Sequence, residues 1–174
     1  MPRSLRAALA FLVLLGASAS AALAAKPIQI ALFDPVQIFP RDEAIHGIRL
    51  NLIYGSNIEM KGIDLGVANR VSGDFTGVQW GIVGMIGGNF VGWQSNYLNL
   101  NEGSGEGLMT SLYNQTKSFT GVQYGVVNYT ETMEGLQVGL VNVTHTMNGL
   151  QIGLVNVIQS KEKLPVLPIV NWVF

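Results

Sequence analysis

The chain contains no cysteine, only two histidines and few charged residues, which make up 12% of its 174 positions. Without thiols it can form neither a disulfide framework nor a cysteine-based metal site. His46 and His145 lie far apart, neither has ligand-like spacing to another histidine, and no Gly-x-Ser-x-Gly motif is present. The sequence therefore predicts a protein that is not an enzyme, with no catalytic residues, no metal ligands and no cofactor.

Long apolar runs are also missing, except near the start. Arg3 and Arg6 precede an apolar run over residues 8–17, and small residues follow it as far as Ala25. This pattern is typical of a secretory signal peptide, here residues 1–25, and the run is too short to span a membrane stably. No cysteine follows that could accept a lipid anchor, and no later stretch approaches the length of a transmembrane helix.

Basic residues are scarce in what remains. Removing the leader takes away two of ten Lys and Arg residues, which leaves eight against eleven acidic residues and a formal net charge of −3. Nucleic-acid-binding proteins are more often basic, so we expect no nucleic-acid partner. A mature chain of about 149 residues fits a single domain.

Glycine, in contrast, is abundant, and eight of the 21 glycines recur at regular intervals of 15 and then 14 residues. These repeat glycines are Gly47, Gly62, Gly77, Gly92, Gly107, Gly121, Gly135 and Gly149. They define a repeat domain over residues 47–162. We interpret residues 26–46 as an N-terminal cap, and residues 163–174 as a C-terminal cap or closing strand.

Each unit places the same residue types at the same distance from its glycine. The first, fifth and sixth residues after the glycine are apolar, with Ala68 the smallest of them, and the third is apolar in most units. Gln recurs at the second position, as in Gln123, Gln137 and Gln151, and Asn at the seventh, as in Asn128, Asn142 and Asn156. Because a strand alternates its faces, we expect the first and third residues to point inward and Gln and Thr outward. Two adjacent apolar residues at the fifth and sixth positions indicate a bend.

Short strands joined at a bend and stacked unit on unit predict an all-β fold, a β-solenoid or β-roll with a cap at each end. Layers about 4.8 Å apart make eight coils a rod of roughly 38 Å. The Asn side chains are expected to form a hydrogen-bonded ladder. In this prediction each unit buries its apolar stripe only when the next unit covers it. If the paired aliphatic positions face solvent, that explanation, and the functional proposal built on it, is wrong.

An antiparallel β-meander or an outer-membrane β-barrel is the alternative. Val170, Trp172 and Phe174 alternate and end on an aromatic residue, as the last strand of outer-membrane barrels often does. The adjacent apolar positions, the central glycines and the equally short turns favour the solenoid.

Several motifs lie along the whole mature chain, namely "PVQIFP", "GIRLNLIYG", "GVQWGIV", the repeated "GLQ-x-GLVN" and the terminal "LPVLPIVNWVF". With them the sequence resembles a family of bacterial surface-repeat proteins named from a spirochaete. The resemblance implies an exported envelope or surface protein and carries no known activity or binding residues. The 14-residue unit is also similar, more loosely, to the β-roll heads of trimeric autotransporter adhesins.

The fourth and fifth units interrupt the pattern with a flexible acidic stretch. Asn99, Glu102 and Glu106 are the candidate residues of a binding loop there. The other carboxylates are scattered at turns and are expected to be solvated. The aromatic residues Trp80, Trp93, Tyr97 and Tyr124 occupy apolar columns, so we expect them in the core rather than on a carbohydrate-binding platform.

The sequence thus predicts an exported, non-enzymatic repeat protein that is a structural or interaction scaffold of the bacterial cell envelope. Its expected location is the outer membrane, the cell surface or the periplasm, with other envelope components as partners. A small integral outer-membrane barrel and a ligand-binding module built on residues 99–106 are the alternatives.

Overall fold

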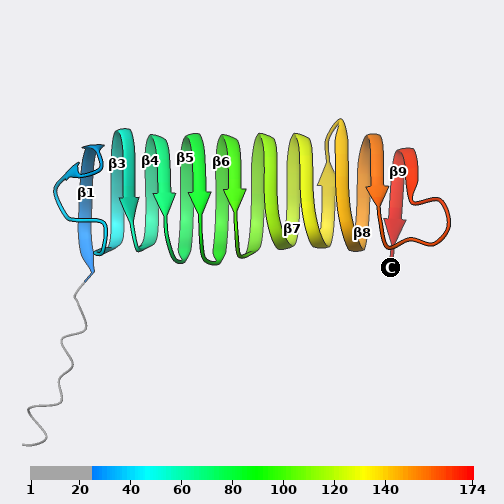
Figure 1. Ribbon diagram of the computed structural model, residues 1–174, viewed down its shortest axis with the longest axis horizontal. Coiled ribbons are helices and arrows are strands. Elements are labelled where there is room, and N and C mark those ends of the chain that lie inside the picture. Colours follow the sequence, from blue (N-terminus) through cyan, green and yellow to red (C-terminus); the bar gives the residue numbers. More distant parts are fainter. Residues whose placement is uncertain (1–24) are drawn as a thin grey trace, which may run out of the picture.

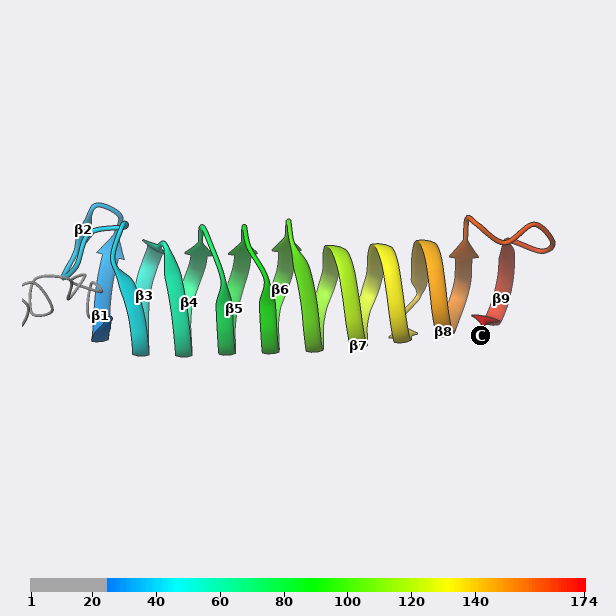
Figure 2. The ribbon, with the colours of Figure 1, turned by 90° about the horizontal axis from the view of Figure 1, so that it is seen from below.

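The computed structural model describes residues 25–174, so the predicted signal peptide lies outside the described residues except for Ala25. The fold is an all-β solenoid of about eight turns, in which parallel coils stack along one axis (Figure 1; Figure 2). The predicted solenoid is confirmed, and the alternative of a meander or barrel is wrong. The strands are β1 (Lys26–Phe33), β2 (Val36–Gln37), β3 (Ala44–Asn57), β4 (Glu59–Val71), β5 (Phe75–Ile86), β6 (Phe90–Asn101), β7 (Ser104–Val138), β8 (Val141–Ile158) and β9 (Val166–Val173).

Successive repeat units lie directly on one another. Gly47 pairs with Gly62, Gly62 with Gly77, and the same register continues to Gly107. Gly135 pairs with Gly149 in the same way. Residues that share a position in the repeat therefore form straight columns along the rod.

The repeat glycines are required by the backbone. All eight have φ between 122° and 153°, a region that side chains with a Cβ rarely adopt. A Cβ built on Gly121 lies 2.1 Å from the carbonyl oxygen of Gly107, and the other repeat glycines are equally close to the layer before them. Glycine therefore recurs in every unit because the backbones of successive layers are in close contact at this position.

The predicted direction of the side chains is wrong. The Gln residues are fully buried, and so are Thr130 and Thr144. The apolar residues at the first, third and fifth positions lie on the outside, as do several at the sixth, such as Ile53 and Val155. Trp80, Trp93, Tyr97 and Tyr124, expected in the core, are exposed.

The reason is the narrowness of the interior. Side chains alternate along the strand as expected, but the second position points inward and the first and third point outward. The bend places the fifth and sixth residues on the outside together. Glycine at the fourth position lies against neighbouring walls, because a Cβ on Gly81 would be 2.0 Å from the Gly66 oxygen and 2.8 Å from Asn69 Nδ2. Flat amide side chains fit such a gap and can hydrogen-bond from layer to layer. The buried Phe residues lie at the other end of the cross-section, away from these glycines. The explanation that each unit buries the apolar stripe of its neighbour is therefore withdrawn.

Both ends continue the columns. In β1, Ile28, Gln29 and Ile30 pair in parallel with Ile48, Arg49 and Leu50. Strand β9 runs antiparallel to β8 and places Trp172, Asn171 and Val170 on Leu150, Gln151 and Ile152. The predicted cap segments thus add a layer each, and the last one reverses direction.

Candidate functional site: a polar core beneath an apolar outer surface

The interior has two columns of polar side chains. The first, called the Gln column, consists of the residues at the second repeat position and their equivalents in the end layers: Gln29, Arg49, Asp64, Gln79, Gln94, Met109, Gln123, Gln137, Gln151 and Asn171. Its members are buried. Gln94 donates to Gln79 Oε1 at 2.9 Å, and Gln137 and Gln151 each donate to the preceding Gln at 2.8 Å. Met109 interrupts the ladder, and Gln123 contacts its sulfur at 3.6 Å.

The second column, called the Asn column, consists of Asn99, Asn114, Asn128, Asn142 and Asn156, all fully buried. Each of the first four donates Nδ2 to Oδ1 of the next, at 2.8–2.9 Å. Asn128 also donates to the Val138 carbonyl at 3.0 Å, and Asn142 to the Ile152 carbonyl at 2.9 Å. The predicted Asn ladder is present, and each of these amides satisfies two groups of the next layer.

Near the N-terminal end, a buried ion pair replaces two glutamines of the Gln column. Arg49 donates Nε and Nη2 to the two carboxylate oxygens of Asp64, at 2.8 and 2.7 Å, and both side chains are fully buried. Arg49 Nη1 donates to the Arg70 carbonyl, and Asp64 Oδ2 accepts from Gln79 at 2.8 Å. Four of the five N–H groups of Arg49 and both oxygens of Asp64 thus have partners inside the rod, which makes the pair a structural element.

One end of the cross-section is apolar. Ile45, Met60, Phe75, Phe90, Phe119, Met133 and Met147 form one buried column, opposite Val71, Ile86 and Ile158. Gly105 breaks this column. The rings of Phe90 and Phe119 stack across the missing side chain with centroids 6.4 Å apart, and a Cβ on Gly105 would be 2.6 Å from Phe119 Cδ2.

The outer apolar surface is the set of residues at the first, third, fifth and sixth repeat positions, with their equivalents Ile28 and Ile30 in β1 and Val170 and Trp172 in β9. Between Gly47 and Val157, these positions hold no charged residue. The surface covers both faces of the flattened coil and the turn between them. That turn is the apolar edge, formed by Leu52, Val67, Ile82, Tyr97, Leu112, Val126, Leu140 and Leu154. Exposure is high, at 66% for Trp80, 63% for Tyr97 and 67% for Leu154.

Two shallow hollows lie along this surface. One of about 710 Å³ is lined mainly by Leu112, Val126, Leu140 and Leu154, with glycines between them. A second of about 540 Å³ lies beside it, between Trp80, Tyr97 and Tyr124. The rows of the third and fifth positions form the walls, so the hollows follow the rod axis.

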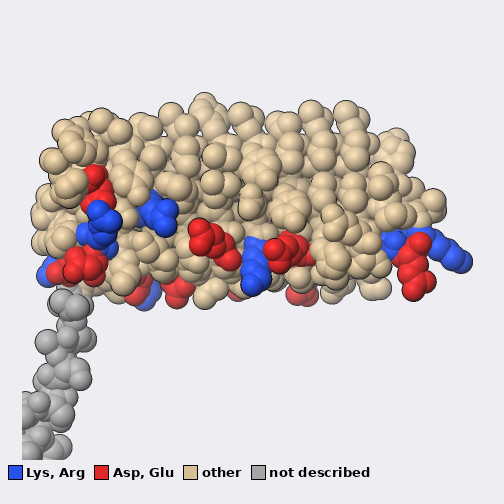
Figure 3. Space-filling model, viewed as in Figure 1, with Lys and Arg blue, Asp and Glu red and all other residues tan. Residues whose placement is uncertain are grey.

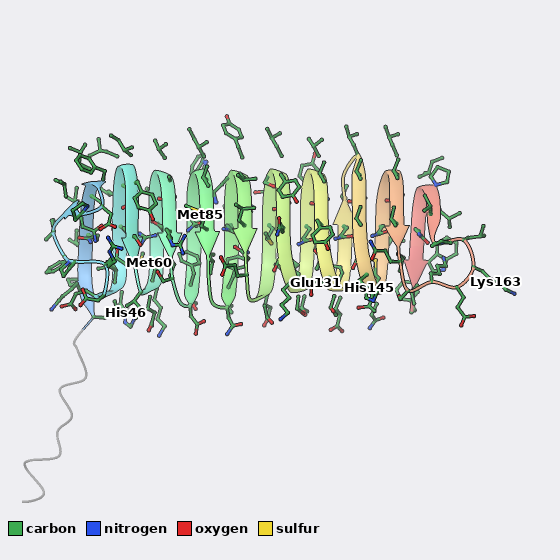
Figure 4. All side chains as sticks on the ribbon, viewed as in Figure 1. His46, Met60, Met85, Glu131, His145 and Lys163 are labelled. Atoms are coloured by element: carbon green, nitrogen blue, oxygen red, sulfur yellow. The ribbon has the colours of Figure 1, made fainter. Side chains whose placement is uncertain are left out.

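Most exposed charged side chains of the repeats lie at the opposite edge, called the charged edge, which includes Glu59, Lys61, Asp74, Glu102, Glu106, Lys117, Glu131 and Glu134. Figure 3 shows most of the acidic and basic residues along the lower side, with some higher at the N-terminal end, and Figure 4 shows His46, Glu131 and His145 at the lower side. Glu59 lies between Lys61 Nζ at 2.7 Å and His46 Nε2 at 2.9 Å. The hydrogen bond from Lys61, and then that from His46, holds the pKa of Glu59 below its usual value.

The structure does not bring the predicted binding-loop residues together. Asn99 is buried in the Asn column, where it donates to Asn114 and accepts from Asn96. Glu102 and Glu106 are exposed at the charged edge. Within residues 25–174, no three His, Cys, Asp or Glu side chains are close enough to hold a metal ion.

Sequence reasoning missed the outer apolar surface. The available signal was the absence of charge from four columns, which we interpreted as burial. Residues 25–174 contain no apolar helix of membrane-spanning length.

Comparison with known proteins finds no matching family model, no similar curated protein and no similar solved structure. The two resemblances noted in the sequence therefore stay predictions.

Proposed function

We propose that this protein is an exported, non-enzymatic scaffold of the cell envelope that acts through its outer apolar surface. Because the paired aliphatic positions face solvent, the functional proposal that was built on their mutual burial loses that basis, and the same role is proposed on different grounds. The supporting observation is the division of the molecule into a polar core whose amide columns hydrogen-bond to one another, one charged edge and an outer surface whose four repeat positions hold no charged residue between Gly47 and Val157. Most polar groups of the core bind one another, so the outer surface is the part available to partners.

The uncharged columns favour an interaction role over a purely internal one. A soluble monomer rarely exposes a contiguous apolar patch above a few hundred Å², and larger patches mark interaction sites. Here the apolar columns extend over both faces and along the rod from β1 to β9. A partner for this surface is therefore part of the proposed function.

Cell fractionation of the native organism tests this proposal. We expect the chain in the envelope fraction with its N-terminus near Lys26, as determined by mass spectrometry. A chain that retains residues 1–25 and stays in the cytosol contradicts the proposal.

A pair of matched variants connects location to the surface. Leu112→Glu with Leu140→Glu places charge on the apolar edge, and we expect it to reduce the envelope-bound fraction at least tenfold. Lys117→Glu with Glu131→Lys changes the charged edge of neighbouring layers and is expected to leave the bound fraction unchanged. Equal retention of both variants contradicts a role for the apolar surface.

A further inference from the structure

We infer that the partner of the outer apolar surface is a lipid layer, into which the rod inserts its apolar edge while the charged edge stays in water. This inference rests on the proposed function, because it names the partner of the same surface. Four features support a lipid partner: the shape of the surface, the position of the charged residues, the depth of the apolar region and the hydrogen bonding of the backbone.

The shape of the surface favours a fluid partner. Apolar residues cover one face, pass around the turn at Tyr97, Leu112 and Leu154, and continue on the other face at Leu98 and Val127. A second copy packed against one flat face leaves the other face and the turn in water. Acyl chains can surround all three at once.

The charges are separated as a water interface requires. In the layer of Gly107, Leu112 lies at the apolar edge and Lys117 at the charged edge, both exposed. The exceptions are Arg70 and, in the N-terminal layer, the ion pair of Asp34 with Arg41. The exposed Arg70 lies two residues from Ser72 on the charged edge and can extend toward water along its own methylenes. Both signs of charge occur on the charged edge, as in Glu59 beside Lys61, so electrostatic attraction to an anionic surface is not needed.

The depth of the apolar region matches one leaflet. The first to the fifth repeat position spans four residues, or about 13 Å of extended chain. Half of a bilayer hydrocarbon core is about 15 Å. The rod therefore lies in the plane of the membrane, immersed to about the mid-plane, with its long axis parallel to the surface.

The backbone meets the main requirement for contact with hydrocarbon, which is that its polar groups are paired within the protein. At the apolar edge, the Leu140 amide donates to the Val126 carbonyl at 2.9 Å, and the Val155 amide donates to the Leu140 carbonyl at 2.9 Å. The faces are paired by the parallel ladders between coils. Strand β9 covers the last coil, so the free strand edges are confined to the two end layers of the rod.

A carbohydrate partner fits the same surface less well. The hollow beside Trp80 and Tyr97 is bordered by Ile82 and Leu112, and Ser95, Thr110 and Ser111 supply its few hydroxyl groups. Sugar recognition needs several convergent polar groups besides an aromatic platform. The larger hollow is lined mostly by aliphatic side chains.

The absence of cysteine permits a direct test, because a single introduced cysteine is labelled specifically. Leu112→Cys and Lys117→Cys place the fluorophore NBD at opposite edges of one layer of the full chain. On addition of phosphatidylcholine vesicles, we expect the label at 112 to shift to the blue and to be quenched by lipids with a nitroxide on the acyl chain. The label at 117 should do neither, and the response at 112 should persist in 1 M salt because it is not electrostatic.

Residues 1–25 are the same in both labelled proteins. Any membrane binding by those residues therefore cannot account for a difference between the labels at 112 and 117. A label at 112 that remains in water with vesicles overturns the inference. So does a label at 112 that is shielded without lipid when the unlabelled Leu112→Cys protein also forms disulfide-linked dimers, since a second copy then covers the surface. Because the test uses purified components, either result leaves the envelope location to be decided by fractionation.

Discussion

At the scale of the residue, hydrogen bonds among amide side chains and one ion pair stabilise the interior. A residue of the Gln column can be replaced only if each donor still faces an acceptor in the next layer. Arg49 is only a donor and Asp64 only an acceptor, so Gln79 must present its NH2 group to Asp64 and its oxygen to Gln94. The ion pair thus fixes the direction of the amides above it. A pair of glutamines can occupy the same two layers, as the later units show.

This equivalence predicts a double-mutant cycle. Asp64→Gln leaves Arg49 charged and buried without a counter-charge, and we expect the free energy of unfolding to fall by about 3–5 kcal/mol. Arg49→Gln combined with Asp64→Gln rebuilds the consensus ladder and should recover more than half of that loss. Urea unfolding monitored by circular dichroism, in one detergent for all variants, provides the measurement. A double variant as unstable as Asp64→Gln contradicts the equivalence.

The Asn column predicts a second loss. Asn128→Ala removes the acceptor of Asn114 Nδ2 and the donor to Asn142 Oδ1 and to the Val138 carbonyl. We expect the free energy of unfolding to fall by about 3 kcal/mol, because buried polar groups lose their partners. Asn148→Ala, at an exposed position, is the control and should change it by less than about 0.5 kcal/mol. Similar values for the two variants argue against the ladder.

At the scale of the element, each coil is an interchangeable layer whose register depends on the repeat length. Deletion of residues 121–134 joins Thr120 to Gly135, so Gly135 takes the place of Gly121 above Gly107. All columns keep their residue types, since Gln137 replaces Gln123 and Asn142 replaces Asn128.

We therefore expect the 14-residue deletion to fold into a rod one layer shorter, with an unchanged β-type circular dichroism spectrum. Deletion of residues 121–127 is the matched control. It removes half a unit and an odd number of residues, so inward and outward positions exchange in the rest of that layer and folding is lost. Thermal melts of the two variants separate these outcomes, and a cooperative melt for the shorter deletion contradicts the layer model.

The repeat register and the solenoid were predictable from the sequence, because Gly-to-Gly spacing and identical Asn positions require stacking. The direction of the side chains was not. Alternation along "GLQIGLV" fixes that Leu150 and Ile152 share a side and Gln151 takes the other, but it leaves open which side is inside. The usual preference for apolar interiors gave the wrong answer, since the gap is set by close contacts at glycines that lie in other layers. The same preference led to the wrong prediction that Trp80, which is exposed, lies in the core.

At the scale of the whole molecule, the two ends of the rod have to be protected from end-to-end association with another copy. Strand β9 lies antiparallel on β8, and Lys161 Nζ donates to Asn171 Oδ1 at 2.8 Å and so holds the connecting segment over it. An uncovered last coil would present unpaired N–H and C=O groups, to which another copy can add.

Truncation after Lys163 removes β9, and we expect the shortened chain to associate end to end into filaments, because the contact is head to tail and does not close. Sedimentation velocity and thioflavin fluorescence follow this change. Removal of Phe174 alone, which is 90% exposed, is the control and should leave the size of the particle unchanged. A truncated chain of the same size as the full chain shows that β9 is not a terminator.

The two amide columns also point in opposite directions. Asn114 gives its hydrogen toward the C-terminal end, to Asn128, whereas Gln137 gives its hydrogen toward the N-terminal end, to Gln123. Their dipoles therefore oppose each other in every layer that has both, and adding layers does not build up an electric field along the axis. The rod can therefore be lengthened by duplication of its repeat unit without an increasing electrostatic potential at its two ends.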